Sequence, residues 1–121
     1  MTDDKYTDIY NKVKDAFEKE RLFLRPDLSL VLLSRIVGTN TVYLSKAINR
    51  GFGCSFHTLV NRMRIQYLVR ESQKRNISIE TIANECAFWS RSTFYDAFRQ
   101  YTGMTPRKYM ERPQYKIEDE S

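Results

Sequence analysis

Two segments of this 121-residue chain carry the same pattern, and this internal repeat limits the fold more than any other feature. Residues 29–38, SLVLLSRIVG, align with residues 78–87, SIETIANECA, at an offset of 49. Each segment begins with a Ser of N-cap chemistry, followed by apolar or small residues at the spacing of one helical face. Each segment therefore predicts a short amphipathic helix with a capped N-terminus.

A second helix is predicted after the first in each copy, now at an offset of 50, so that the one-residue difference falls in the turn. The apolar positions of this second helix align, Leu44, Ala47 and Ile48 with Phe94, Ala97 and Phe98. Gly53 and Gly103 then stand where a glycine commonly ends a helix. Capped helix, tight turn, second helix and glycine stop is the order of a helix-turn-helix.

The turn between the two helices needs a small residue where the backbone becomes left-handed. Gly38 supplies it in the first copy, and Ala87 stands at the matching place in the second. A Cβ in the left-handed region costs about 1 to 2 kcal/mol. Either the second turn is slightly strained, or its geometry differs from that of the first.

The second helix of such a motif packs one face on its partner and presents the other to the DNA major groove. Within WSRSTFYDAFRQYTG, residues 89–103, the inner stripe is predicted as Phe94, Ala97, Phe98 and Tyr101. The outer side, here called the second recognition face, consists of Arg91, Ser92, Tyr95, Asp96 and Arg99. The matching first recognition face consists of Thr41, Val42, Ser45, Lys46 and Asn49. Such side chains can contact base edges, thymine methyls or phosphates, so we predict these ten residues as DNA-binding.

A long helix is predicted between the two copies. Apolar residues recur at helical spacing from about Ser55 to about Gln73, and roughly 19 residues at 1.5 Å each span roughly 28 Å. Successive major grooves on one side of B-DNA recur about every 34 Å. The linking helix therefore has nearly the length needed to present both faces to adjacent grooves. The linking helix also carries five basic residues, which either contact phosphates or only keep its exposed side solvated. They are Arg62, Arg64, Arg70, Lys74 and Arg75.

The positive charge is concentrated in the repeated region. Residues 34–112 hold thirteen basic and five acidic side chains, a balance of +8, although the whole chain carries only +5. Residues 1–33 have a balance of −1 and residues 113–121 a balance of −2. This distribution suits a polyanionic partner such as nucleic acid, although many solvated faces are also basic.

Several function classes find no support in the sequence. His57 is the only histidine, and neither Cys54 nor Cys86 has a second ligand at metal-binding spacing, so both cysteines are expected to be small buried hydrophobes. Phosphate-binding glycine loops are absent, and no catalytic motif is recognisable. We predict no enzyme activity, no cofactor and no metal. Without a secretory signal or an apolar membrane span, the chain is expected to be cytoplasmic with no membrane partner.

The two ends of the chain differ from its centre. An amphipathic helix is predicted from about Thr7 to about Arg21, packing on the first helix-turn-helix, with residues 22–24 buried behind it. Nothing in this segment looks like a sensor pocket. The acidic tail after Pro113 is predicted to be disordered.

Residues from about Leu28 to Met110, two-thirds of the chain, resemble the DNA-binding domain of AraC/XylS-type bacterial transcription regulators. The matching stretches are YLSKAINRGFGCSF (43–56), Arg64-Ile65, ISIETIA (77–83) and SRSTFYDAFRQYTGMTPRKY (90–109). The resemblance implies an all-α fold of about seven helices, two helix-turn-helix subdomains joined by a long linking helix. It also implies sequence-specific binding to double-stranded promoter DNA. The base-reading positions it implies are Thr41, Val42, Ser45, Lys46, Arg91, Ser92, Tyr95 and Asp96.

The chain departs from the family pattern at several positions. The family usually has Gly at Ala87, a small Ala at Leu68, and a Leu pair at residues 71 and 72. These changes make the later part of the linking helix less apolar, which predicts a less firmly held second unit. Asp96 replaces a basic or neutral residue, and an acid near phosphates is repelled unless it accepts from a cytosine or orients an Arg. The DNA contacts of the first unit are therefore predicted with more support.

The sequence divides into an N-terminal helix and connector (1–27), a first helix-turn-helix (28–54), a linking helix (55–76), a second helix-turn-helix with a closing helix (77–112) and a tail (113–121).

The leading hypothesis is a sequence-specific DNA-binding transcription regulator. Alternatives are a helical protein-interaction module that no longer binds DNA and, with less support, an RNA-binding protein. RNA polymerase and an N-terminal sensor or dimerisation domain absent from this chain are further candidate partners. Since many relatives carry such a domain N-terminally, the chain is expected to be either a short regulator or a fragment of a longer one.

Overall fold

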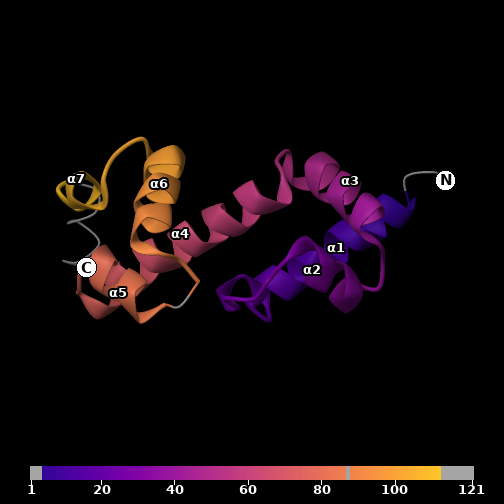
Figure 1. Cartoon of the computed structure of the whole chain (residues 1–121), viewed down its shortest axis with the longest axis horizontal. Helices are drawn as coiled ribbons and strands as arrows, with labels where there is room; N and C mark the ends of the chain where they lie inside the picture. The colour runs from indigo at the N-terminus through magenta and orange to yellow at the C-terminus, as the bar shows by residue number, and fades with distance from the viewer. Residues whose placement is uncertain (1–3, 87, 113–121) are drawn as a thin grey trace. The chain divides into compact units, whose positions relative to one another are not determined.

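The computed structural model describes residues 4–86 and 88–112, and it is all-α there, as predicted (Figure 1). The elements are α1 (Asp4–Glu18), the 3-10 turn η1 (Leu22–Leu24), α2 (Leu30–Val37), α3 (Thr41–Phe52), α4 (Phe56–Arg75), α5 (Ile79–Glu85), α6 (Arg91–Thr102) and α7 (Pro106–Met110). No strand occurs among these residues. The predictions for Ala87 and for the tail at 113–121 lie outside the described residues.

The repeat is visible in the hydrogen bonds that begin each helix. The hydroxyl of Ser29 accepts a hydrogen bond from the Leu32 backbone N–H at 3.1 Å, and that of Ser78 accepts one from the Thr81 N–H at 3.1 Å. Each side chain satisfies one of the free N–H groups at a helix start. The predicted caps of α2 and α5 are therefore confirmed.

The first helix-turn-helix makes its turn at Gly38, as predicted. Gly38 has φ 77° and ψ 39°, and its N–H donates to the backbone oxygen of Arg35 at 3.3 Å. Because a side chain is disfavoured in this left-handed conformation, glycine suits the position. The chain can then reverse into α3 within two residues, Thr39 and Asn40.

The chain divides into two units between Val60 and Asn61, each with its own buried core. In the first unit the buried apolar residues come from α1, α2, α3 and the start of α4, and they include Val13, Phe17, Leu33, Leu44, Ile48 and Leu59. In the second unit they come from the rest of α4 and from α5 and α6, and they include Ile65, Leu68, Ile79, Ile82, Phe94 and Phe98. The aligned positions of the two copies are therefore the core positions of both units.

Helix α4 is the predicted linking helix, 20 residues long and capped at Ser55, whose hydroxyl accepts from the Thr58 N–H at 3.2 Å. Two of the residues that depart from the family pattern lie inside the core of the second unit. Leu68 has no exposed surface, and Ser72 is 1% exposed. The core thus accommodates the larger side chain at position 68.

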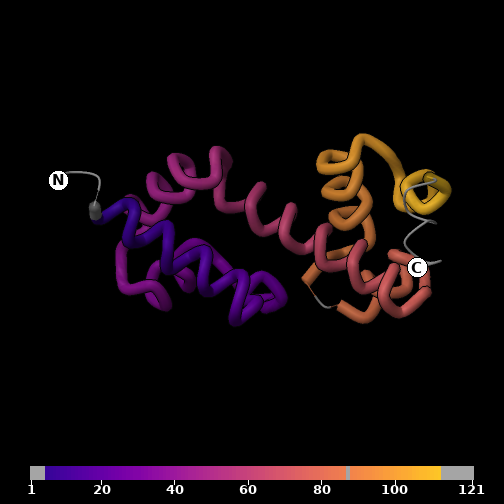
Figure 2. Tube along the Cα trace, turned by 180° about the vertical axis from the view of Figure 1, so that it is seen from behind, coloured from indigo at the N-terminus to yellow at the C-terminus, as the bar shows by residue number. Residues whose placement is uncertain are grey.

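Helix α1 packs mainly on α3, so the N-terminal helix belongs to the first unit (Figure 2). The rings of Tyr10 and Phe52 lie 4.7 Å apart, and those of Tyr6 and Tyr43 lie 6.1 Å apart. The close approach depends on Gly51, because a Cβ added there would overlap the ring of Tyr10. A glycine inside a helix is therefore explained by contact with a helix about 40 residues earlier.

The contact between Gly51 and Tyr10 predicts that Gly51→Ala has opposite effects on the free energy of unfolding with and without the Tyr10 ring. An alanine at position 51 should improve the intrinsic stability of α3 by about 1 kcal/mol, because glycine is a poor helix former. In the intact chain the overlap with Tyr10 should cost about 1 to 3 kcal/mol, as overpacking usually does. We therefore expect Gly51→Ala to lower the free energy of unfolding in urea, and to raise it by about 1 kcal/mol in a Tyr10→Ala background. Stabilisation of equal size in both backgrounds would show that α1 does not depend on Gly51.

Three sequence-based expectations were wrong in detail. Residues 22–24 were expected to be buried, but Leu22 and Leu24 are half-buried and Phe23 is buried. Tyr101 was assigned to the inner stripe of α6 but is 43% exposed, because its hydroxyl accepts a hydrogen bond from Gln66 Nε2 at 2.8 Å on the surface of the unit. Cys54 and Cys86 are half-buried rather than fully buried. Both cysteines lie just outside the ends of helices, where packing on one side only is available.

Candidate nucleic-acid interface

The first recognition face lies on α3, opposite its core side. Leu44, Ala47 and Ile48 are at most 1% exposed and hold α3 against the first unit. On the other side Val42 is 59% exposed and Lys46 and Asn49 are exposed, whereas Thr41 and Ser45 are half-buried. All five predicted residues therefore share one accessible side of one helix.

Two contacts order this face locally. Asn40 caps the N-terminus of α3, and its Oδ1 accepts a hydrogen bond from the Tyr43 N–H at 2.8 Å. Nδ2 of Asn49 donates to the backbone oxygen of Ser45 at 2.9 Å, which leaves its amide oxygen and second N–H for other partners. One amide N–H of Asn49 is thus bonded to the helix backbone, while the side chain stays exposed.

Helix α1 packs on α3 through residues that flank the first recognition face. Tyr43 and Arg50 recur at i and i+7, and α1 contacts both: the Arg50 guanidinium lies 4.6 Å from the centre of the Tyr6 ring, and Lys5 Nζ lies 3.9 Å from that of Tyr43. Such cation–π contacts contribute about 0.5 to 1 kcal/mol each at exposed sites. Arg50 is therefore engaged by α1, although its charge alone would have made it a DNA-contact candidate.

The second recognition face lies on α6 in the same way. Phe94, Ala97 and Phe98 are at most 5% exposed, while Arg91, Ser92, Asp96 and Arg99 are exposed. Ser90 caps the N-terminus of α6, and its hydroxyl accepts a hydrogen bond from the Thr93 N–H at 3.3 Å. Ser90 matches Asn40 at the offset of 50, a pair of caps that the sequence comparison above did not identify.

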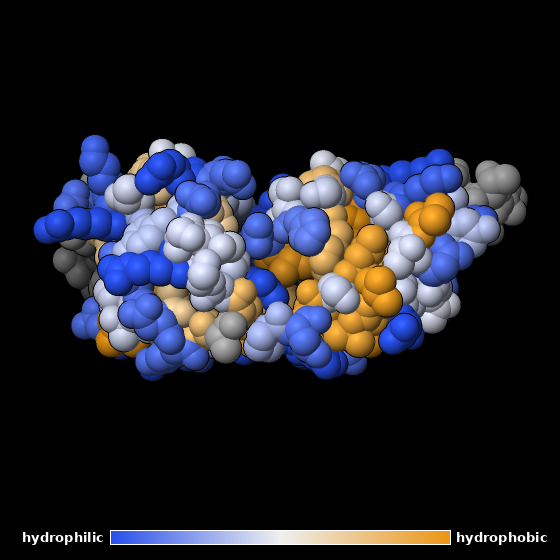
Figure 3. All heavy atoms as spheres, in the orientation of Figure 1, coloured by the Kyte–Doolittle hydropathy of each residue, from blue (hydrophilic) through white to orange (hydrophobic). Residues whose placement is uncertain are grey.

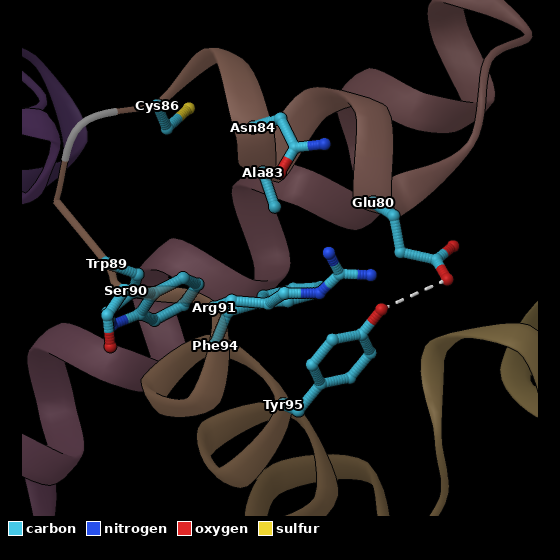
Figure 4. A pocket seen from close by; sticks show the side chains of 9 residues that line it. All are labelled: Glu80, Ala83, Asn84, Cys86, Trp89, Ser90, Arg91, Phe94 and Tyr95. Atoms are coloured by element: carbon cyan, nitrogen blue, oxygen red, sulfur yellow. Dashed lines mark hydrogen bonds between the residues drawn. The ribbon is translucent and has the colours of Figure 1, made fainter.

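Tyr95 differs from the other members of this face because it is half-buried and already has a partner. Its hydroxyl donates to Glu80 Oε2 of α5 at 3.4 Å, and its ring lies 5.0 Å from the ring of Phe94 (Figure 4). Glu80 also lines a small pocket with Asn84 and Arg91. Sequence analysis missed Glu80, since an acid in the first turn of a helix is ordinarily explained by the helix dipole.

The basic residues of α4 separate into different roles. Arg64 is 7% exposed and lies 4.4 Å from the centre of the Phe88 ring, and burial lowers the pKa of its guanidinium to about 10. Arg75 donates two hydrogen bonds to Glu85, at 3.0 and 3.2 Å. Of the five basic residues in the linking helix, these two are held within the second unit.

The surface of the first unit also carries apolar groups. Figure 3 shows apolar residues gathered over α2, where Val31 is 49% exposed and Ile36 is 41% exposed. These residues lie outside both recognition faces. No helix among the described residues is long and apolar enough to cross a membrane.

Two units with the same helix order, matched caps and matched outer faces define a double helix-turn-helix domain. Residues 33–112, more than half of the chain, match the model of a family described as a helix-turn-helix domain. The chain therefore belongs to the AraC-type helix-turn-helix family, and the resemblance noted from its sequence is confirmed. Membership in this family of regulators also confirms that the chain is not an enzyme.

Similar proteins occur in several bacteria. The chain is 33% identical over 99 residues to an uncharacterized HTH-type transcriptional regulator of Staphylococcus aureus (strain COL), an alignment that covers 82% of this chain. It is 29% identical over 87 residues to the uncharacterized transcriptional regulatory protein YesN of Bacillus subtilis (strain 168), which covers 69% of this chain. The chain spans about 13% of the length of the first relative and about 24% of the second.

Two solved structures share the fold. The C-terminal domain of AraT, a response regulator from Geobacillus stearothermophilus, superposes with a TM-score of 0.71 at 24% identity, covering 84% of this chain and 82% of that one. A Listeria innocua protein of unknown function superposes with a TM-score of 0.67 at 26% identity, covering 88% of this chain and 94% of that one. The arrangement of helices is therefore shared with independently determined structures.

Proposed function

We propose that the chain binds double-stranded promoter DNA and reads its sequence with both recognition faces, placed in two successive major grooves. The observation that carries this proposal is the match between α3 and α6. Each buries an equivalent apolar triplet and leaves an equivalent hydrogen-bonding side exposed. A helix with one face on the core and the other free is the arrangement that enters a major groove.

The charge and the linking helix support the same proposal. Residues 34–112 carry a balance of +8, which favours approach to a phosphate backbone. Helix α4 has 20 residues, so its length is roughly 30 Å at 1.5 Å per residue, close to the spacing of about 34 Å between successive grooves. We further propose that the protein regulates transcription in the bacterial cytoplasm, as part of a longer polypeptide or alone. Contact with RNA polymerase and attachment to an N-terminal sensor or dimerisation domain are further predictions.

Selection of bound oligonucleotides from a random duplex pool tests the proposal directly. We expect two recurring sequence boxes with centres about ten base pairs apart, one for each recognition face. A protein-interaction module would enrich no sequence. A single box would show that only one unit reads bases, and the variants below identify which unit.

Arg91 tests the second recognition face. If its guanidinium contacts a guanine, Arg91→Ala should relax the preference at one base pair by roughly 1 to 3 kcal/mol and leave the other positions unchanged. Lys46→Ala is the parallel test for the first face. Fluorescence anisotropy on the selected site and its single-base variants measures both. Lys14→Ala removes the same charge from the exposed side of α1 and should change no preference. Equal weakening on all sequences would assign Arg91 or Lys46 to phosphate contact.

A further inference from the structure

Tyr95 lies in the middle of the second recognition face, and two contacts orient its side chain within the second unit. Its ring packs at 5.0 Å from the Phe94 ring with an interplanar angle of 53°, which sets the ring plane. Its hydroxyl is directed to Glu80 Oε2 at 3.4 Å on the neighbouring helix α5. The ring and the tip of the side chain are therefore oriented by residues of the second unit itself.

The partner of the hydroxyl determines what Tyr95 can offer to a base. A phenol has one O–H donor, and an ionised carboxylate accepts it more strongly than a neutral base edge does. At 3.4 Å the contact is long for this class of bond, so it directs the hydroxyl more than it stabilises the fold. With its donor turned toward α5, Tyr95 has mainly the carbon edge of its ring to present outward.

Arg91 belongs to the same arrangement. Figure 4 shows its side chain extending from α6 toward α5, where Ala83, Asn84 and Glu80 line the same pocket. A guanidinium near the carboxylate offsets the repulsion that an acid would otherwise exert on DNA phosphates. Glu80 and Arg91 line the same pocket beside the second recognition face.

The first unit has no equivalent of this pair. At the offsets of the repeat, Glu80 corresponds to Val31 and Tyr95 to Ser45. Val31 is 49% exposed and has no polar atom in its side chain to direct a neighbour. The contact between Glu80 and Tyr95 therefore has no counterpart at the matching positions of the first unit. The two recognition faces would then contact bases by different chemistry.

We propose that Glu80 is a specificity-determining positioning residue, which withholds the Tyr95 hydroxyl so that the ring edge of Tyr95 selects a thymine through its methyl group. The inference rests on the proposed function, because it concerns the second recognition face in contact with DNA. Thymine is the base that presents an apolar group in the major groove, and a deoxyuridine at the same place lacks only that methyl. One buried methyl corresponds to about a four-fold change in affinity.

The test uses the full chain and the duplex selected from the random pool, with each thymine of the second box replaced in turn by deoxyuridine. For the unsubstituted protein, one replacement should weaken binding about four-fold. Tyr95→Phe should keep this penalty, because the hydroxyl is not used, and Tyr95→Ala should abolish it. Glu80→Gln retains an acceptor and should behave as the unsubstituted protein. Glu80→Ala releases the hydroxyl and should reduce the penalty to less than about two-fold.

Three results would overturn the inference while leaving sequence-specific binding intact. In the first, Tyr95→Phe loses base preference as much as Tyr95→Ala does. In the second, Glu80→Ala keeps the full loss of affinity on deoxyuridine replacement. In the third, no thymine of the second box weakens binding when it is replaced by deoxyuridine. Failure of the unsubstituted protein to select any sequence would instead overturn the proposed function. Circular dichroism of each variant confirms that it retains its helices, and the conservative Tyr95→Phe and Glu80→Gln variants do not depend on tolerance of a truncated side chain.

Discussion

Replacing Phe98 with alanine is expected to lower the free energy of unfolding of the second unit by about 3 to 5 kcal/mol. Phe98 has no exposed surface, and its ring lies 5.9 Å from that of Phe94 and 5.5 Å from that of Tyr109. Truncation would remove contacts to both rings and leave a cavity among side chains from α4, α5, α6 and α7. Since whole small proteins are stable by only about 5 to 15 kcal/mol, a loss of this size should leave the second unit close to unfolding.

Amide hydrogen exchange is the measurement that localises this effect. Residues of α5, α6 and α7 should lose protection in Phe98→Ala, whereas those of α2 and α3 should keep theirs, because the two units have separate cores. Ile48→Ala, at the matching position of the first unit, should produce the reverse pattern, with a loss of about 2 to 5 kcal/mol. Tyr101→Phe, one turn from Phe98 but on the surface, should change stability by less than about 1.5 kcal/mol. Uniform loss of protection along the chain would contradict independent cores.

Raising the salt concentration from about 50 to about 200 mM is expected to weaken duplex binding by roughly 150-fold to 1,800-fold. The estimate assumes about four to six phosphate contacts, each of which contributes about 0.9 to the logarithmic salt slope on B-DNA. Arg62 and Arg70 on α4, and Arg107 and Lys108 on α7, are basic residues outside the recognition faces that could supply such contacts. Arg64 and Arg75 are not counted, because one is buried and the other is paired with Glu85.

Anisotropy titrations on a random-sequence duplex at several salt concentrations measure this slope. Replacing one contributing lysine or arginine with alanine should reduce it by about 1, and Lys14→Ala should leave it unchanged. A protein-interaction module would not bind duplex at either salt concentration. Binding that is tight but independent of salt would require a contact surface other than the basic one described above.

The helices were predictable because local chemistry specifies them. Ser29, Ser78, Gly38 and the periodic apolar residues act within one or two turns of their own positions, and the repeat doubled every local signal. The boundaries of α3 and α6 and the buried triplets on each followed from the same patterns. What a residue contributes to its own helix is therefore recoverable from sequence.

Contacts between helices were much less accessible to sequence reasoning. Gly51 and Tyr10 meet across about 40 residues, and Glu80 and Tyr95 meet across 15, so neither pair leaves a periodic signal. Tyr101 fits the apolar stripe by spacing but lies outside the core because Gln66 offers its hydroxyl a partner at the surface. The ten recognition-face residues could be listed from sequence, but which of them are already engaged by neighbours required the structure.

The packing of α1 on α3 makes the first recognition face depend on side chains outside that face. Tyr6 and Tyr10 belong to α1 and not to the first recognition face, yet their contacts with Tyr43, Phe52 and Gly51 hold α3 in place. A genetic screen for defective promoter binding should therefore recover substitutions in the N-terminal helix, and suppressors of them in the glycine-containing last turn of α3. Such alleles would mimic lesions in the DNA contacts while leaving every one of those contacts chemically intact.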